Sequence, residues 1–252
     1  MRHTCGALGV LLLVAFAGCY STTSTQRGTV MAPHLPLSDG EIAAGTRVEV
    51  HAALARGQGE DLDPEDATAT AESQGALVIR RGMDAKTELG GTLELAWTPS
   101  ARYLGGGDAS GAPNRAVIAP TVNLRTRLYA GEQVTVLVAG DLGVVSVPLD
   151  VDGEAIRDLE ITARAALVPS IRVRNATLFA SFGLVTAQAV PARFSELNNE
   201  TDSVVTTGLG VGIGAGVNLD VAERVHLGAR GSLVGGAHAR FPQIGFGVGI
   251  DL

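Results

Sequence analysis

The histidines and glycines of this chain do not have the spacing of a metal, nucleotide or catalytic site. The five histidines are scattered, at positions 3, 34, 51, 226 and 238, whereas zinc sites take ligands at short, characteristic intervals. The glycine runs lack both G-x-G-x-x-G and the lysine of a phosphate-binding loop. His238 is a candidate catalytic base, but nothing in the sequence pairs with it. We therefore expect no enzyme activity, no cofactor and no metal.

One acidic segment offers the oxygen ligands that a hard cation needs. Asp150, Asp152 and Glu154 alternate over five residues, an arrangement found in calcium-binding loops. The glycine is misplaced, however, at Gly153, and the twelfth position is Ile161 instead of a glutamate. The sequence therefore favours a solvated acidic loop over a cation site.

Cysteine chemistry is confined to the start of the chain, where Cys5 and Cys19 are the only two cysteines. Arg2 and His3 precede an apolar run from Gly6 to Phe16. This run is shorter than the roughly 20 residues that a membrane-spanning helix needs, and it is typical of a secretory signal. Once the signal is removed, one cysteine at most is left, so the exported protein has no disulfide of its own.

The residues after the apolar run fit two processing routes. Ala17-Gly18-Cys19 resembles the lipobox of bacterial lipoproteins, which implies that Cys19 is acylated and becomes the first mature residue. Ala15-Phe16-Ala17 also fits the A-x-A pattern, which predicts plain cleavage before Gly18. We expect residues 1–18 to be the signal peptide and Cys19 to be the lipidation site. By the same resemblance, Tyr20 in place of an aspartate after the cysteine implies the outer membrane.

Composition excludes nucleic-acid binding and favours a β-rich protein. The 252 residues carry 19 basic and 26 acidic side chains, a formal net charge of -7, and Lys86 is the only lysine, so no basic patch is expected. Charged residues make up 18% of the chain, against about 25% in a typical soluble domain. Glycine occurs 33 times in 252 residues, which is nearly twice its usual share of about 7%. Residues 20–45 are rich in Ser, Thr and Pro, and we expect residues 19–45 to form a lipidated, flexible tether.

From Thr46 onward the dominant pattern is alternation of apolar and polar or small residues, which is typical of strands with two different faces. The last strand shows it best, since apolar residues from Ile244 to Leu252 alternate with glycines and Asp251. Ten strands are predicted, and eight would also fit. They cover residues 46–55, 75–82, 90–103, 116–129, 133–147, 160–174, 176–190, 204–218, 224–235 and 242–252.

The connections between these strands alternate in length. Short turns are expected at 130–132, 175 and 220–223, an intermediate one at 83–89, and longer loops at 57–74, 105–115, 148–159, 191–203 and 236–241. Short turns at one end and long loops at the other are typical of bacterial outer-membrane barrels. An even strand count puts both ends of the barrel on the short-turn side, where we expect an acylated Cys19.

Acidic residues are concentrated in the long loops, which we interpret as solvated surfaces that could meet surface or envelope partners. They include Glu60, Asp61, Asp63, Glu65, Asp66, Asp150, Asp152, Glu154 and Asp158.

Inside hydrocarbon every backbone N–H and C=O must be paired within the protein, so strands can span a membrane only as a closed barrel. Apolar faces then point to lipid and polar faces to the lumen. In a narrow lumen charged side chains would pair, and the glycines would make room for arginines. The predicted polar lumen network consists of Arg47, Glu49, His51, Glu94, Arg125, Arg127, Asp141, Arg164, His226 and Arg230.

Residues 46–252 thus resemble the small outer-membrane β-barrel class, which typically ends on an alternating apolar strand, here with Leu252 in place of the frequent phenylalanine. The resemblance implies an all-β fold, a single antiparallel transmembrane barrel of about ten strands, in the cell outer membrane with lipid as its partner. The function expected is non-enzymatic, either structural and surface-interacting or that of a narrow channel.

Two other interpretations use the same residues. A soluble β-sandwich or lipocalin-like domain on a lipid anchor, binding an apolar ligand or a partner protein, would show the same alternation with its apolar faces inward. The run Gly208, Gly212, Gly216 also fits the G-x-x-x-G motif of membrane helices, over residues 203–219. The direction in which the apolar side chains point decides between the membrane barrel and the soluble domain.

Overall fold

The computed structural model of the protein describes residues 26–28, 32–56, 58–59, 71–97, 116–151, 154–188, 195–197, 200–202, 207–235 and 239–252. The predicted signal peptide, the predicted lipidation site Cys19 and the candidate base His238 lie outside these residues. Among the described residues no helix is long and apolar enough to span a membrane.

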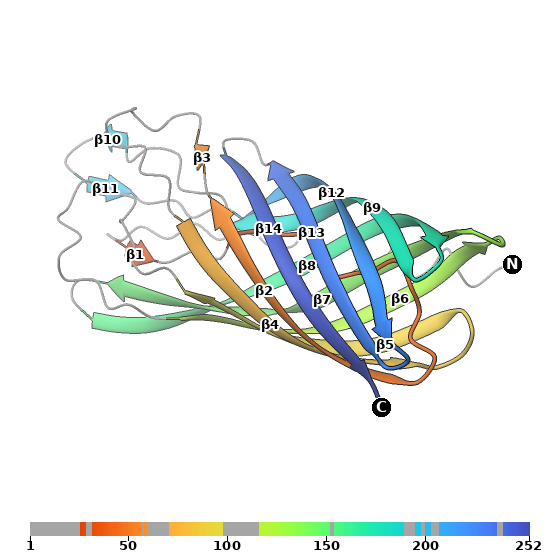
Figure 1. The fold of residues 1–252 in the computed structure, drawn as a ribbon. Helices are drawn as coiled ribbons and strands as arrows, with labels where there is room; N and C mark the ends of the chain where they lie inside the picture. The colour runs from red at the N-terminus through yellow and green to blue at the C-terminus, as the bar shows by residue number, and fades with distance from the viewer. Residues whose placement is uncertain are drawn as a thin grey trace, which may run out of the picture.

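Ten antiparallel strands form the wall of a barrel (Figure 1). They are β2 (Thr46–Arg56), β4 (Ala71–Gly82), β5 (Thr87–Trp97), β6 (Val117–Ala130), β7 (Val134–Val151), β8 (Glu154–Val173), β9 (Ala176–Gln188), β12 (Thr207–Ala222), β13 (Val225–Gly235) and β14 (Ala239–Asp251). Consecutive wall strands pair with each other, and β14 pairs with β2, so the barrel closes. Closure leaves no free edge along the wall. The predicted fold class is confirmed.

Several of the predicted loops contain strand residues. The loop expected at 148–159 is a continuation of the β7–β8 hairpin, which pairs as far as Val151 and Glu154. Asp152-Gly153 lies between these two residues in the sequence, and Asp-Gly is a preferred pair for a two-residue hairpin turn. The range 191–203 contains β10 (Ser195–Leu197) paired with β11 (Glu200–Asp202). The short β3 (Gln58–Gly59) pairs with the start of β14.

The two ends of the barrel differ as predicted. Turns of two to four residues join β4 to β5, β6 to β7, β8 to β9 and β12 to β13 at one end, which we call the short-turn end. In the β4–β5 turn the amides of Lys86 and Thr87 donate to the Asp84 carboxylate, and these bonds lower the pKa of that carboxyl. The amide of Leu252 donates to the Thr46 carbonyl at 2.9 Å, so both ends of the wall meet at the short-turn end.

The apolar side chains point outward, which settles the open question of orientation. On β2 and β14, for example, Leu54 and Phe246 are 66% and 64% exposed, whereas Arg47 and Glu49 are 4% and 6% exposed. The outward apolar set also includes Leu77, Ile79, Leu93, Leu95, Val122, Leu124, Leu142, Leu178, Phe182, Val211, Ile213, Ile244 and Ile250. A soluble barrel or sandwich packs such side chains inward, so that alternative is wrong. The helix alternative is wrong too, because residues 207–222 form β12.

The largest departure from prediction concerns residues 32–45, which were expected to be part of a flexible tether. Ala32 to Ser38, Gly40 and Ala43 are all buried. In Figure 1 this segment, coloured orange-red, runs through the inside of the barrel towards the first strand. We call residues 32–43 the plug segment. Its prolines, Pro33 and Pro36, suit an extended path that needs no backbone pairing with the wall.

Candidate functional site

The candidate site is the lumen, which contains one apolar contact between the plug segment and the wall. Leu35 of the plug segment packs among buried wall residues, none more than 5% exposed. They are Leu137, Ala139, Ala166, Val168, Val185 and Val234, on β7, β8, β9 and β13. The alternation had predicted a polar lumen wall. The wall instead contains an apolar hollow that fits one leucine.

Wall glycines make this contact possible. A Cβ atom on Gly212 of β12 would lie 2.8 Å from Leu35 Cδ2, and one on Gly183 of β9 would lie 2.9 Å from the same atom. Carbon atoms do not approach that closely without displacement, so side chains here would push the leucine out. Gly212 makes room for the plug segment and not for an arginine as predicted. At Gly183 the backbone oxygen of Ala165 on the neighbouring strand is closer still to the added Cβ, so the wall also requires that glycine. Gly245, whose Cβ would lie 3.3 Å from Arg230 Nε, fits the original expectation.

The plug segment bends at Gly40, where φ is +81°. This left-handed conformation favours glycine, and a Cβ here would also lie 2.7 Å from Ser170 Cβ. The Ser170 hydroxyl donates to the Gly40 carbonyl at 3.0 Å, and the Glu41 amide donates to Asp39 Oδ1 at 3.1 Å. The bend holds the Asp39 carboxylate in place beside the wall.

Three arginines from three strands bind Asp39. Its carboxylate lies 2.9 Å from Arg47 Nη1 on β2, 2.7 Å from Arg80 Nη2 on β4 and 3.3 Å from Arg125 Nη1 on β6. The Leu37 carbonyl also accepts a hydrogen bond from Arg125. Charge-assisted bonds of this kind are roughly twice as strong as neutral ones. The plug segment is thus held by polar contacts as well as by Leu35.

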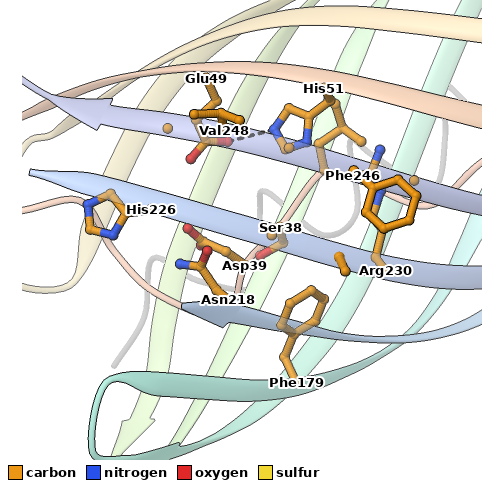
Figure 2. Close-up of a pocket in the computed structure, with 16 residues that line it drawn as sticks. Ser38, Asp39, Glu49, His51, Phe179, Asn218, His226, Arg230, Phe246 and Val248 are labelled. Carbon is orange, nitrogen blue, oxygen red and sulfur yellow. Dashed lines mark hydrogen bonds and ion pairs between the residues drawn. The ribbon is translucent and has the colours of Figure 1, made fainter. Parts of the chain in front are cut away.

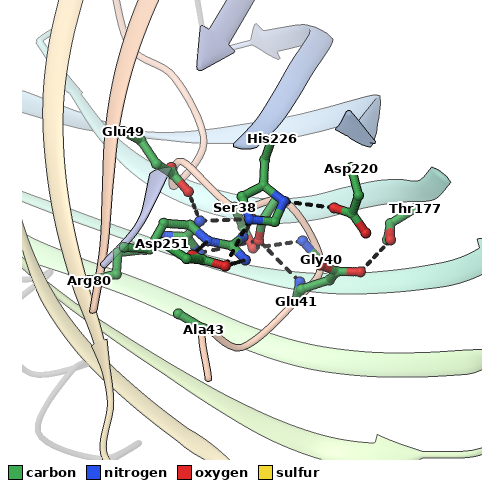
Figure 3. A network of polar contacts seen from close by, with 12 residues as sticks. Ser38, Gly40, Glu41, Ala43, Glu49, Arg80, Thr177, Asp220, His226 and Asp251 are labelled. Carbon is green, nitrogen blue, oxygen red and sulfur yellow. Dashed lines mark hydrogen bonds and ion pairs between the residues drawn. The ribbon is translucent and has the colours of Figure 1, made fainter. Parts of the chain in front are cut away.

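Arg80 is fully buried and joins the plug to two wall carboxylates. Besides Asp39, it pairs with Glu49 and, at 3.3 Å, with Glu88. Glu88 in turn accepts a hydrogen bond of 2.7 Å from the amide of Ala43, at the downstream end of the plug segment. Figure 3 shows Arg80 and Glu49 of this network, with the plug residues Ser38, Gly40, Glu41 and Ala43 beside them.

A second polar layer surrounds His34. Arg164 Nη2 donates to Glu94 at 2.8 Å and lies 3.1 Å from Asp141. His34 Nε2 lies 3.1 Å from the same glutamate. The Asn123 amide donates to Asp141 at 3.0 Å and extends the layer to β6. Buried charges are costly unless they are paired and hydrogen-bonded, and here most of them are.

At the short-turn end the network reaches the rim. Arg47 donates to Asp251 at 2.6 Å, and the two ring nitrogens of His226 lie 2.7 Å from Asp220 and 2.8 Å from Asp251. Glu41 of the plug segment accepts from Arg172 at 2.7 Å and also from Thr177. The downstream half of the plug is therefore tied to β8 and β9 as well as to β2, β4 and β5.

The structure brings eight of the ten predicted lumen residues into these contacts. His51 joins them because its Nε2 lies 2.8 Å from Glu49 Oε2. The eight are Arg47, Glu49, His51, Glu94, Arg125, Asp141, Arg164 and His226. Arg230 makes no ion pair with a described residue, although it lies on the lumen wall beside a small cavity (Figure 2). Arg127 is half-buried, and its Nε has no partner among the described residues.

Several members of the network were not predicted. Arg80 lies within the predicted strand 75–82, where it alternates with Leu77 and Ile79, but it was not included in the lumen network. Glu88 lies in the predicted turn 83–89, because β5 begins earlier than predicted. His34 and Asp39 belong to the segment that was interpreted as a tether. No periodicity marks that segment, because an extended chain inside a barrel has wall on every side.

Five lumen arginines face five carboxylates in these layers. The arginines are Arg47, Arg80, Arg125, Arg164 and Arg230, and the carboxylates are Asp39, Glu49, Glu88, Glu94 and Asp141. One of the five negative charges comes from the plug segment. Among the described residues no group of three or more His, Cys, Asp or Glu side chains could hold a metal ion.

No family model matches the chain, and no curated protein matches it. Solved barrels are similar at low identity. An outer membrane channel from Pseudomonas putida F1 has a TM-score of 0.49 and 11% identity, covering 86% of this chain and 99% of that one.

Two further barrels show the range of proteins with this similarity. The β domain of the Bordetella autotransporter BrkA has a TM-score of 0.48 and 16% identity, covering 82% of this chain and all of that one, 100%. The Escherichia coli outer membrane protease OmpT has a TM-score of 0.40 and 8% identity, covering 83% and 97%. A channel, an autotransporter domain and a protease are thus all similar to this chain, and the similarity does not distinguish between their activities.

Proposed function

We propose that the protein is a non-enzymatic outer-membrane barrel whose lumen is filled by its own plug segment, with a structural and surface-interaction role. The membrane part of the proposal is supported by the wall itself. Apolar side chains cover the outside of a closed barrel with a charged lumen, the arrangement that a lipid environment requires.

The observation that carries the closed-lumen role is the triple binding of Asp39. A plug held by Arg47, Arg80 and Arg125, with Leu35 seated in a dry hollow, leaves little space for a water-filled path. Conduction needs such a path, with binding weak enough for ions to leave. The long β7–β8 hairpin and the acidic loops at the opposite end from the turns are then the parts available to surface partners.

Membrane insertion is tested by resistance to carbonate extraction and by the mobility of the unheated protein on a detergent gel. We expect the protein to stay in the membrane fraction and to migrate differently before and after boiling, because the closed barrel resists detergent. Release by carbonate together with unchanged mobility would contradict the proposal.

A narrow-channel role is the second candidate, and the charge of the lumen favours it. With Asp39 withdrawn, the five arginines of these layers would face four carboxylates among the described residues, with Asp251 beside Arg47 at the rim, and a lumen this rich in arginine suits a pore for anions. This role requires the plug segment to leave, so the purified protein should be silent in planar bilayers until the plug is weakened. Conductance that appears once the plug is weakened would favour the channel, whereas silence in both states would favour the closed structural role.

A further inference from the structure

The plug segment runs the whole length of the lumen in one direction. At its upstream end Ala32 clusters with Ala55 and Phe241, near the end of β2 and the start of β14, away from the short turns. At its downstream end the Ala43 amide binds Glu88, and the Gly82 amide donates to the Gly45 carbonyl at 3.0 Å beside the β4–β5 turn. The chain therefore descends from the long-loop end to the short-turn end before the first wall strand begins.

The strand upstream of the plug continues this path. β1 (Gln26–Gly28) pairs antiparallel with the extended end of β7, with Gln26 opposite Val151 and Gly28 opposite Leu149. This part of β7 lies beyond Ser146, the last β7 residue that pairs with β6. β1 thus pairs with a strand edge that protrudes beyond the wall at the long-loop end. It runs from there towards the lumen (Figure 1).

The length of chain before β1 limits where Cys19 can lie. Gln26 lies seven residues after Cys19, a reach of at most about 25 Å when fully extended. Between Val151 and Val134, β7 has 17 steps, which is about 56 Å along the strand and about 40 Å along the barrel axis at the usual tilt. Cys19 cannot reach from β1 to the short-turn end.

We infer that the mature amino terminus leaves the barrel at the long-loop end, so that Cys19, when acylated, inserts its acyl chains into the leaflet at that end. This inference rests on the proposed membrane function. It revises the expectation from the even strand count, which placed Cys19 beside the short turns. Because long loops of outer-membrane barrels face the cell exterior, the anchor would lie in the outer leaflet.

An anchor at this end would have a mechanical consequence. The plug segment would be fixed upstream by lipid and downstream by β2, to which it is covalently joined. Leaving the lumen would then require release from both the wall contacts and the anchor. Lipidation would act as a restraint on the plug in addition to retaining the protein at the membrane.

Cysteine labelling on intact cells tests the topology. Thr23→Cys reports on the amino terminus, Asn198→Cys on a long-loop region and Glu132→Cys on a short turn, each labelled with a membrane-impermeant maleimide. The unaltered protein measures any residual thiol at Cys19. We expect Thr23→Cys and Asn198→Cys to label on intact cells, and Glu132→Cys only after the outer membrane is permeabilised.

The outcomes distinguish a failure of the inferred exit of the amino terminus from a failure of the proposed membrane barrel. Labelling of Thr23→Cys only after permeabilisation, with Asn198→Cys still labelled on intact cells, would overturn the exit at the long-loop end and leave the barrel intact. Equal labelling of Asn198→Cys and Glu132→Cys under both conditions would contradict the membrane barrel itself.

A disulfide between plug and wall tests the path independently of labelling. We expect the pair Leu35→Cys and Gly212→Cys to oxidise, because a Gly212 Cβ would lie 2.9 Å from Leu35 Cγ and the smaller cysteine relieves the clash. Leu35→Cys with Val211→Cys is the matched control, since Val211 is 61% exposed on the outer face. Absence of the first cross-link in a barrel that still shifts on heating would overturn the threaded path.

Discussion

At the scale of single residues, Asp39 of the plug segment joins arginines of three wall strands. Its carboxylate meets guanidinium groups from β2, β4 and β6, so it links three strands that are not all neighbours. The wall arginines keep some partners without it, because Arg80 also pairs with Glu49 and Glu88. Asp39 therefore matters most for retaining the plug segment, and less for the charge balance of any one arginine.

The first prediction concerns this carboxylate. Asp39→Asn keeps the size of the side chain but leaves buried arginines with one anionic partner fewer. Breaking a buried ion pair from one side costs about 3 kcal/mol, and we expect a loss of that order in the free energy of unfolding, measured by urea titration in lipid vesicles. Glu132→Gln, in the exposed β6–β7 turn, is the control and should change stability by less than about 0.5 kcal/mol.

A loss in Asp39→Asn no larger than in Glu132→Gln would show that the three arginines do not depend on the plug. The barrel would then have to be stable with the segment withdrawn from the lumen.

The second prediction concerns the glycines that face Leu35. Gly212→Ala should destabilise the protein by about 1–3 kcal/mol, since its new methyl group would overlap the leucine. Adding Leu35→Ala should recover part of that loss, and a double-mutant cycle measures the coupling. Gly231→Ala is the control, because its Cβ would meet nothing closer than 3.8 Å. Purely additive effects of the two substitutions would contradict the contact.

At the scale of elements, the strands were predictable and the plug segment was not. A strand with lipid on one side and lumen on the other leaves an alternation in the sequence, and all ten wall strands could be located by it. The hairpin beyond Pro148 was missed because its alternation weakens above the membrane, where both faces can be polar. Only the Asp152-Gly153 pair could have indicated it.

Residues 32–43 are buried, although their sequence is typical of an exposed linker, and there is a physical reason for this difference. Pro33, Pro36 and Gly40 are typical of linkers when considered locally. Their burial depends on Leu137, Val185, Arg80 and Glu88, which lie far away in the chain. The candidate site could therefore be predicted for wall residues that face inward, and not for His34 or Asp39.

The third prediction tests whether the plug behaves as one element. Leu35→Asp would place an unpaired charge in the apolar hollow, which costs more than the site can compensate. We expect the amides of residues 34–43 to lose protection from hydrogen exchange in this variant, while those of β12 and β13 keep theirs. Loss of protection throughout the wall would mean that plug and barrel unfold together, which would contradict a separable plug.

At the scale of the whole molecule, the order of the chain constrains how the barrel can close. The plug segment directly precedes β2, and β2 pairs with the last strand, β14, along nine residue pairs from Arg47–Asp251 to Ala55–Gln243. Once this seam has formed, the segment can enter only lengthwise through the lumen. Its ion pairs with β2 and β4 and its hydrogen bond to β5 involve strands that follow it closely in sequence, so these contacts can form before the seam closes.

The last prediction joins the charge of the lumen to its closure. In the combined variant Leu35→Asp, Asp39→Ala the plug loses its apolar contact and its contacts with three arginines. Leu35→Asp restores one negative charge to the segment, but that charge leaves with it. Among the described residues, the two inner polar layers of the emptied wall then carry five arginines against Glu49, Glu88, Glu94 and Asp141. We expect conductance in planar bilayers where the parent protein has none, with a reversal potential shifted towards that of chloride in a salt gradient.

The sign of that shift separates a plugged pore from a damaged wall. A barrel that merely leaks through disrupted strands would conduct without preference and would lose its heat-dependent gel shift. Replacing Arg230, which lines the remaining cavities without an ion pair to a described residue, by Gln in the same background should reduce the preference for chloride. Selectivity for cations in the combined variant would contradict the positive lumen, because pore-lining charge sets the sign of the permeant ion.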